Sequence, residues 1–205
     1  MDIVVIISLT ITLFMILNPF SSVPMFINIT RGLEEKVVIS YASKAVAVAT
    51  ILLFFFLFTG EFLLDIFGVT MSSFQVAGGI ILLMMAIEMV LGSHRSETNE
   101  RSGAKWAVIA SPILTGPGMI SATIIYSMEY GMAPVMAAGA IALFCTWIIM
   151  ALSPRIIKIV GEQALDVLSK IMGLFIAARG VESIFTGAMD WINQNSASVA
   201  GLIRY

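Results

Sequence analysis

Two short polar segments lie within long apolar stretches of this sequence, and each contains two prolines five residues apart. The first reads Asn18-Pro-Phe-Ser-Ser-Val-Pro24, and the second reads Ser111-Pro-Ile-Leu-Thr-Gly-Pro117. A proline removes a backbone hydrogen-bond donor and clashes with the preceding helical turn. Two prolines at this spacing, joined by polar or small residues, predict a broken helix. A pair of proline kinks made for packing is the alternative.

A broken helix offers backbone groups that can bind a small zwitterion. The N-terminus of a half-helix suits a carboxylate, and the free carbonyls that end the preceding half suit an ammonium group. The alternative is that the polar side chains only cap the two half-helices. The candidate substrate-binding residues in the two segments are Asn18, Ser21, Ser22, Ser111, Thr115, Gly116 and Gly118.

A third apolar segment adds Gln75, Gly78 and Gly79 to the candidate substrate-binding residues. The glycines allow close approach of a backbone, and the glutamine is a polar group about one helical turn before them. Helix packing at the glycines and a hydrogen bond from the glutamine to a carbonyl are the alternatives.

Ionisable residues within apolar segments are candidates for coupling transport to an ion, because they are costly in lipid and usually functional. They are Glu88, Glu182 and Arg179. Arg179 would lie about 13 Å into the membrane at about 1.5 Å per residue. Glu182 follows three residues later on the same helical face, where the two can pair. The alternatives are carboxylates that reach the membrane interface and a static ion pair that only stabilises the helix.

The elements that must position these residues are strongly apolar. Hydrophobic residues form 59% of the 205 residues and charged residues only 12%, which is about half the usual charged share. We therefore expect an all-α polytopic membrane protein, since barrel strands would alternate in polarity. A soluble enzyme, a disordered chain and a nucleic-acid-binding protein are excluded as leading interpretations. The six predicted spans cover residues 3–29, 45–64, 66–91, 106–128, 132–152 and 167–187.

The rest of the composition limits cofactors and partners. The single cysteine, Cys145, excludes a disulfide within the chain. With the single histidine, His94, it also excludes a zinc site built from His and Cys. The net charge of −2 favours no polyanionic partner. The apolar start of the chain lacks a basic region and a cleavage signal, so we expect a retained span and not a signal peptide.

Basic residues predict the orientation of the spans. Nine of the 11 Lys and Arg residues fall in the first, third and fifth connections, whereas the other side carries only Arg204. By the positive-inside rule these connections face the cytoplasm. Both termini are then expected outside the cytoplasmic membrane of a prokaryote. The nine residues are Arg31, Lys36, Lys44, Arg95, Arg101, Lys105, Arg155, Lys158 and Lys170.

The two proline segments belong to a longer internal repeat. They are 93 residues apart, and Gly79 and Glu88 recur as Gly173 and Glu182 at an offset of 94 residues. Two features at nearly one offset predict two three-helix units, and an odd number of spans in each unit makes the units inverted. The first and fourth helices are expected to be discontinuous. The predicted organisation is one membrane domain, with repeats at residues 1–92 and 105–205 and a cytoplasmic linker at residues 93–104.

At these motifs the sequence resembles the MarC family of six-span membrane proteins, which includes the SnatA-type small neutral amino acid transporters. The stretches that carry the resemblance lie at residues 18–26, 60–68, 74–82 and 112–121. The resemblance extends over nearly the whole chain and implies transport of glycine, alanine or serine. One departure concerns the first motif, where Phe20-Ser-Ser-Val23 replaces the family's usual glycine-containing stretch between the prolines. This departure affects the expected substrate more than the expected fold.

Together these features predict a secondary transporter that works by alternating access about a midplane site. No nucleotide-binding loop is found, so a proton or sodium gradient is expected to drive transport, without a cofactor or a bound metal. The expected partners are a small neutral amino acid and the lipid bilayer, and homo-oligomer formation stays open. A passive channel and an exporter of small metabolites are the alternatives. An enzyme is disfavoured because no Ser/His or paired-aspartate group falls within the spans.

Overall fold

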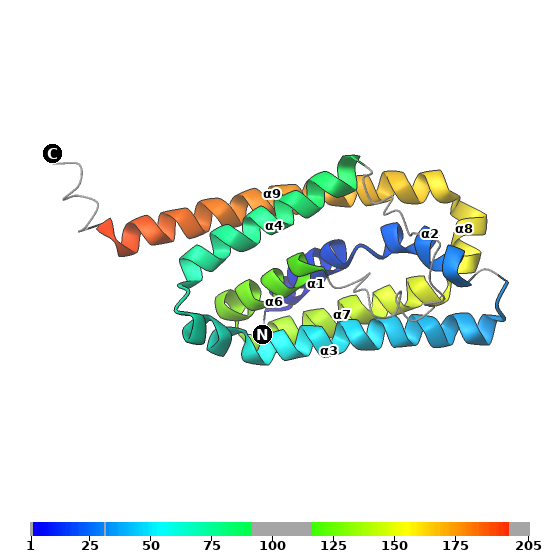
Figure 1. Cartoon of the computed structure of the whole chain (residues 1–205), viewed down its shortest axis with the longest axis horizontal. Coiled ribbons are helices and arrows are strands. Elements are labelled where there is room, and N and C mark those ends of the chain that lie inside the picture. The colour runs from blue at the N-terminus through cyan, green and yellow to red at the C-terminus, as the bar shows by residue number, and fades with distance from the viewer. Residues whose placement is uncertain (1, 31, 92–115, 197–205) are drawn as a thin grey trace.

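The computed structural model describes residues 2–30, 32–91 and 116–196, and every regular element in these ranges is an α-helix (Figure 1). The all-α fold class predicted from the sequence is therefore confirmed. The predicted linker at residues 93–104 and the first part of the predicted fourth span lie outside these ranges. The helices are α1 (Ile3–Leu17), α2 (Pro19–Thr30), α3 (Glu35–Phe67), α4 (Met71–Leu91), α6 (Pro117–Tyr130), α7 (Met132–Ala151), α8 (Ser153–Val160) and α9 (Glu162–Gln194).

Four helical stretches in the described part of the chain are long and apolar enough to cross a membrane. They agree with the first, second, third and fifth predicted spans. The predicted fourth span corresponds to α6, of which 14 residues are described, and the predicted sixth span to the 33-residue α9. The helices α3 and α9 begin before their predicted apolar segments, because hydropathy marks the part of a helix in lipid and not its charged ends. The four stretches are Ile3–Thr30, Glu35–Phe67, Met71–Leu91 and Met132–Ala151.

The first span is broken at Asn18, where α1 ends and α2 begins. Asn18 has a left-handed backbone with φ 40° and ψ 62°, and no other non-glycine residue in the described ranges has a positive φ. Pro19 follows as the first residue of α2, a position at which its missing N–H costs nothing. Pro24 does not break the chain a second time, since α2 continues through it. The interruption is thus a single sharp turn directly before the first proline.

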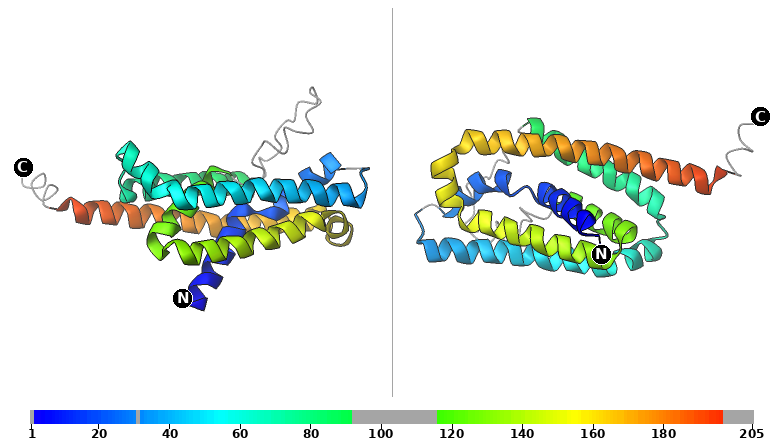
Figure 2. Two further views of the ribbon diagram at one scale, coloured as in Figure 1. Left: turned by 90° about the horizontal axis from the view of Figure 1, so that it is seen from below. Right: turned by 180° about the vertical axis from the view of Figure 1, so that it is seen from behind.

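Two helix pairs enclose a central layer, as Figures 1 and 2 show. The helix α4 packs along α9, α3 packs along α7, and α1, α2 and α6 lie between the two pairs. Leu13, Leu53 and Leu82 are at most 2% exposed and lie in the core that these layers share. Large apolar side chains such as Phe58 and Phe62 are exposed on the outside. A surface of this kind suits contact with lipid tails.

Small residues at a seven-residue spacing bring α4 and α9 into backbone contact. The facing pairs, in antiparallel order, are Ser72 with Gly187, Gly79 with Gly180, and Ala86 with Gly173. A Cβ atom built at Gly187 would lie 2.6 Å from the carbonyl oxygen of Ser72, which leaves no room for a side chain. Small residues at such interfaces allow membrane helices to pack closely. The helices α4 and α9 are therefore closely packed along their shared length.

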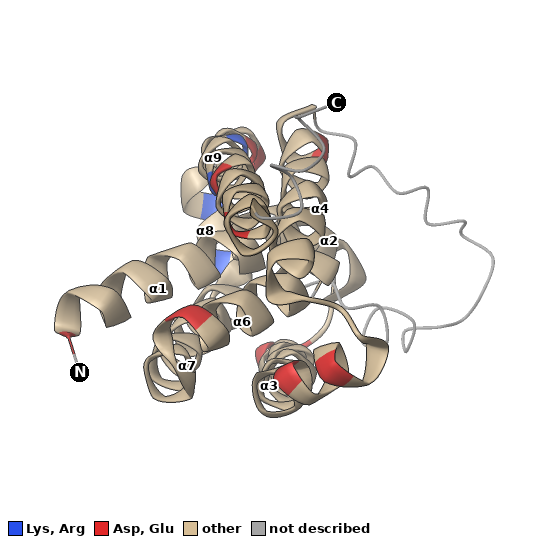
Figure 3. Ribbon diagram, turned by 90° about the vertical axis from the view of Figure 1, so that its left-hand side faces the viewer, with Lys and Arg blue, Asp and Glu red and all other residues tan. Residues whose placement is uncertain are grey.

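The two ends of the bundle differ in charge. Apart from Arg179, the Lys and Arg residues of the described ranges lie toward the end formed by α8 and the starts of α3 and α9. In Figure 3 the opposite end faces the viewer, and acidic segments are seen on α3, with basic segments about α8 behind them. At the basic end, Arg155 of α8 and Glu35 of α3 form an ion pair with an N–O distance of 2.6 Å. We call the two ends the basic end and the acidic end.

Candidate functional site

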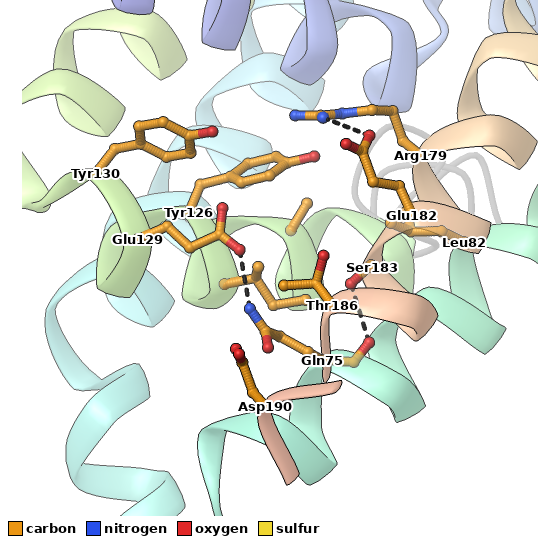
Figure 4. A pocket seen from close by; sticks show the side chains of 12 residues that line it. Gln75, Leu82, Tyr126, Glu129, Tyr130, Arg179, Glu182, Ser183, Thr186 and Asp190 are labelled. Atoms are coloured by element: carbon orange, nitrogen blue, oxygen red, sulfur yellow. Dashed lines mark hydrogen bonds and ion pairs between the residues drawn. The ribbon is translucent and has the colours of Figure 1, made fainter. Parts of the chain in front are cut away.

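A pocket of about 370 Å³ lies between α4, α6 and α9, toward the acidic end of the bundle (Figure 4). Its volume is near the lower limit of the range of about 300–1,000 Å³ that is usual for small-molecule sites. Leu82, Ala122 and Ile125 contribute its apolar wall. Its charged lining residues are Glu129 on α6 and Arg179, Glu182 and Asp190 on α9. The pocket thus offers one cationic group and three carboxylates to a small ligand.

Gln75 of α4 connects the three helices of the pocket. Its side-chain Nε2 donates a hydrogen bond of 2.9 Å to Glu129 Oε1 on α6. Its backbone carbonyl accepts a hydrogen bond of 3.0 Å from Ser183 Oγ on α9. Gln75 is only 3% exposed, and its buried Oε1 atom has no hydrogen-bond partner in the part of the chain that the structure describes. A buried acceptor is therefore left over at the pocket wall.

Arg179 of α9 provides the cationic group of the pocket. Its Nη1 atom lies 3.0 Å from Glu182 Oε2, so the ion pair predicted from the three-residue spacing is confirmed. Its guanidinium carbon lies 5.6 Å from the ring centroid of Tyr126 on α6. The Nε atom is buried and has no hydrogen-bond partner. Arg179 is thus held by a carboxylate and an aromatic ring while one of its donors stays unused.

The break of the first span holds a second buried polar group. Asn18 is 4% exposed, and its Nδ2 donates a hydrogen bond of 2.8 Å to Ser169 Oγ on α9. The Oδ1 atom of Asn18 is buried and has no hydrogen-bond partner among the described residues. Ser21 and Ser22 donate their hydroxyls to the carbonyl oxygen of Asn18, at 3.1 and 3.5 Å. These two contacts agree with the capping alternative, whereas Asn18 keeps an unused acceptor.

The structure brings some of the predicted site residues together and separates others. Gln75, Arg179 and Glu182 line the pocket, whereas Asn18 lies with Ser169 at the break. Gly78 packs against α6, since a Cβ atom there would lie 2.9 Å from Ile125 Cδ1. Together with the contact between Gly79 and Gly180, this agrees with the packing alternative for both glycines.

The remaining predicted residues lie on α4, on α6 or before it. Gly116 precedes the first residue of α6, and among the described residues a Cβ atom there would meet only Met85 Sδ, at 3.9 Å. Gly118 packs against Leu82 and Met85 of α4. Glu88 is exposed on α4 and is not among the residues that line the pocket. Ser111 and Thr115 lie outside the described residues.

The sequence interpretation did not select Glu129 or Tyr126 as site residues. The predicted fourth span ended at residue 128 and left Glu129 in a short connection, but α6 continues to Tyr130. Residues three and four apart share a helical face, so the spacing of Tyr126, Glu129 and Tyr130 was the signal that could have found them. All three line the pocket together with Arg179.

The chain is similar to a known family of membrane proteins and to several of its individual members. The sequence model of the MarC family of integral membrane proteins matches residues 3–192. The UPF0056 membrane protein YhcE of Escherichia coli is 31% identical over 188 residues, which cover 85% of this chain and 87% of that protein. A UPF0056 membrane protein of Archaeoglobus fulgidus is 30% identical, with 87% and 90% covered. Another, from Methanocaldococcus jannaschii, is 31% identical, with 86% and 92% covered. No solved structure matches the chain.

Proposed function

Because the chain belongs to the MarC family of integral membrane proteins, we propose that it is a secondary transporter for small neutral amino acids such as glycine, alanine and serine. The protein acts as a carrier and not as an enzyme. Transport proceeds by alternating access, in which a site within the membrane opens to one side at a time.

One observation carries this proposal: among the described residues, a polar pocket lies toward the acidic end of the bundle and a buried apolar cluster toward the basic end. Toward the acidic end, the pocket between α4, α6 and α9 has a polar lining with exposed residues such as Glu182 and Thr186. Toward the basic end, α2, α3, α7 and α9 pack around an apolar cluster. The buried members of this cluster are Val23, Phe26, Val38, Ala42, Met150 and Leu165. This difference between the ends is what a carrier open to one side requires.

The break at Asn18 supplies a midplane site for the substrate. Its unused side-chain acceptor and the first turn of α2 present the groups that a zwitterion needs, and Ser21 and Ser22 lie in that turn. In the second repeat, Gly116 and Gly118 at the start of α6, with Ser111 and Thr115 before them, take the corresponding role. Polar backbone at membrane depth is tolerated where it is buried in protein or lines a cavity.

Contacts between the helices support the proposed six-span inverted repeat of residues 1–92 and 105–205. The offset of 94 residues relates Gly79 to Gly173 and Ala86 to Gly180. The contact of Gly79 with Gly180 in one unit order therefore becomes the contact of Gly173 with Ala86 when the two units are exchanged, and the structure contains both contacts. The same offset relates α2 to α6, α3 to α7 and α4 to α9. Accordingly, α6 packs against α3 and α4, and α2 packs against α7 and α9. A two-fold relation between the units produces this exchange.

The proposal also specifies in which membrane the protein lies and how it is oriented there. The basic end faces the cytoplasm by the positive-inside rule, so the pocket opens outward and both termini lie outside the cytoplasmic membrane of a prokaryote. A proton or sodium gradient drives the cycle, with Glu88, Glu182 and Arg179 as the coupling residues, because ionisable groups within spans are costly unless they function. The bilayer and the amino acid are then the partners, and self-association stays open.

Counterflow in proteoliposomes tests the proposal. Vesicles that hold the purified protein and unlabelled alanine are diluted into labelled alanine, with proton and sodium gradients imposed in separate runs. A carrier accelerates uptake of the label when unlabelled alanine is inside, and the uptake saturates. Flux that rises linearly with concentration and is unaffected by internal alanine would establish the passive channel, and no alanine flux would refute the substrate assignment.

A proline variant tests the role of the break in the same vesicles. Pro19→Ala lets α1 continue into α2, so we expect loss of counterflow with normal insertion. Pro134→Ala is the matched control, because Pro134 stands in the first turn of α7, outside the break and the pocket. Wild-type kinetics in the Pro19 variant would reduce this proline to a packing residue.

A further inference from the structure

We propose that the pocket between α4, α6 and α9 is a second amino acid site, separate from the break at Asn18. It binds the ammonium group through Glu129 and Gln75 and the carboxylate group through Arg179. The physiological role of this site rests on the proposed function, but binding to it can be measured without transport.

The ammonium side of the site is defined by a buried acceptor that has no partner. Gln75 is 3% exposed and lines the pocket, yet its Oε1 atom accepts no hydrogen bond. An unsatisfied buried polar atom is costly, and a ligand ammonium group would supply the missing donor. The contact of 2.9 Å from Gln75 Nε2 holds the Glu129 carboxylate beside this acceptor. A carboxylate accepts several hydrogen bonds, so Glu129 can also bind the ligand.

The carboxylate side of the site is defined by Arg179. A guanidinium group has five N–H donors in a planar fork, and Glu182 Oε2 takes a contact to Nη1 only. The Nε donor is buried and unused. The Tyr126 ring, 5.6 Å from the guanidinium carbon, supports the planar group from one face. Arg179 can therefore bind a ligand carboxylate while it keeps its contact with Glu182.

The arrangement of charge selects a zwitterion over an anion. Figure 4 shows Arg179 on one side of the Tyr126 ring and Gln75 with the Glu129 carboxylate on the other side. Because Glu182 and Asp190 also line the pocket, the carboxylates outnumber the single cation and repel a ligand of net negative charge. A small molecule that carries both an ammonium and a carboxylate group satisfies both sides at once.

Thiol protection locates the site on the purified protein in detergent. Thr186→Cys, in a Cys145→Ala background, places a thiol at an exposed position of the pocket lining. We expect alanine to slow its reaction with a polar thiol reagent at lower concentration than propionate or alaninamide. Asn193→Cys, exposed on α9 beyond the pocket, is the matched control and should react at an unchanged rate.

Two charge variants in the same background show which residue binds which charged group of the ligand. Arg179→Gln should remove the advantage of alanine over alaninamide, and Glu129→Gln should remove its advantage over propionate, each by about 10- to 100-fold. Glu61→Gln, an exposed carboxylate on α3, should change neither ratio. Arg179→Lys keeps the positive charge. If the two variants are equally stable on heating, we expect Arg179→Lys to retain more of the advantage of alanine over alaninamide than Arg179→Gln does.

The possible results separate this proposal from the proposed function. Absence of protection by alanine would overturn the amino acid site. If sodium chloride alone protects as strongly as alanine does, the amino acid site is also overturned, in favour of a cation site. Equal losses for all three ligands in both variants would also overturn it. Protection without counterflow would leave the site in place and refute transport, whereas saturable counterflow without protection would refute the second site only.

Discussion

The backbones of Gly79 in α4 and Gly180 in α9 touch. A Cβ atom built at Gly79 would lie 2.5 Å from the carbonyl oxygen of Gly180, and one built at Gly180 would lie 2.8 Å from that of Gly79. Gln75 lies one turn from the first glycine, and Arg179 is the neighbour of the second. The contact therefore fixes the separation of the two walls of the pocket that carry the unused acceptor and the cation.

The first prediction is that Gly180→Ala destabilises the protein. The new Cβ would meet backbone atoms of α4, the Gly79 oxygen at 2.8 Å and the Leu83 nitrogen at 3.0 Å, which cannot yield as a flexible side chain does. Overpacking of this kind costs about 1–3 kcal/mol, so we expect a fall of several degrees in the midpoint of thermal unfolding in detergent. Gly116→Ala is the control, since the one described atom that its Cβ would meet is Met85 Sδ, at 3.9 Å. Equal midpoints for the two variants would contradict the tight contact.

The second prediction separates the backbone and the side chain of Asn18. Asn18→Gly keeps the left-handed turn without strain, whereas Asn18→Ala adds a left-handed penalty of about 1–2 kcal/mol. Both variants lose the side-chain acceptor and the bond to Ser169. We expect both to lose counterflow, and the alanine variant to have the lower unfolding midpoint. Retained counterflow in Asn18→Gly would show that the break needs only the turn.

The helices and the first break could be predicted from the sequence, because apolar length and paired prolines act locally. Asn18 tolerates the left-handed conformation better than most residues, and it stands directly before Pro19. The position of the break could not be predicted from the prolines alone, because α2 continues through Pro24. The pairing of Arg179 with Glu182 was predictable for the same local reason, since both lie on one helix.

The partners across helices were harder to predict, because they depend on register. Gly79 was matched with Gly173 as a repeat equivalent, but in space it faces Gly180. The seven-residue spacing of small residues on both helices was the available signal for this register. Glu129 was missed because its contact is with Gln75, 54 residues away in the sequence, and no local pattern connects the two.

The third prediction concerns orientation in the membrane of intact cells. In a Cys145→Ala background, Asn193→Cys at the end of α9 should react with an impermeant thiol reagent from outside, and Lys158→Cys in α8 should not. The reason is the concentration of Lys and Arg at the end that holds α8. Permeabilised cells provide the control, since both positions are exposed and should then react. The opposite pattern would reverse the orientation and turn the pocket toward the cytoplasm.

The fourth prediction concerns the ion pair of Arg179 with Glu182. The two side chains are 34% and 65% exposed, and pairs with such exposure contribute about 0.2–1 kcal/mol. A purely structural role therefore predicts that Arg179→Met with Glu182→Gln folds, inserts and transports like the original protein. If Arg179 couples transport to an ion gradient, the same double variant should keep its unfolding midpoint within a few degrees but lose transport or its dependence on pH.

Glu182→Gln alone sharpens this comparison. It removes the carboxylate that competes for Arg179 while the guanidinium stays in place beside Tyr126. We therefore expect alanine to protect Thr186→Cys at a concentration equal to or lower than in the original protein, in contrast to the loss in Glu129→Gln. The pH dependence of counterflow, measured on the single and double variants, checks the coupling role. Unchanged transport and pH dependence in the double variant would exclude a coupling role for Arg179.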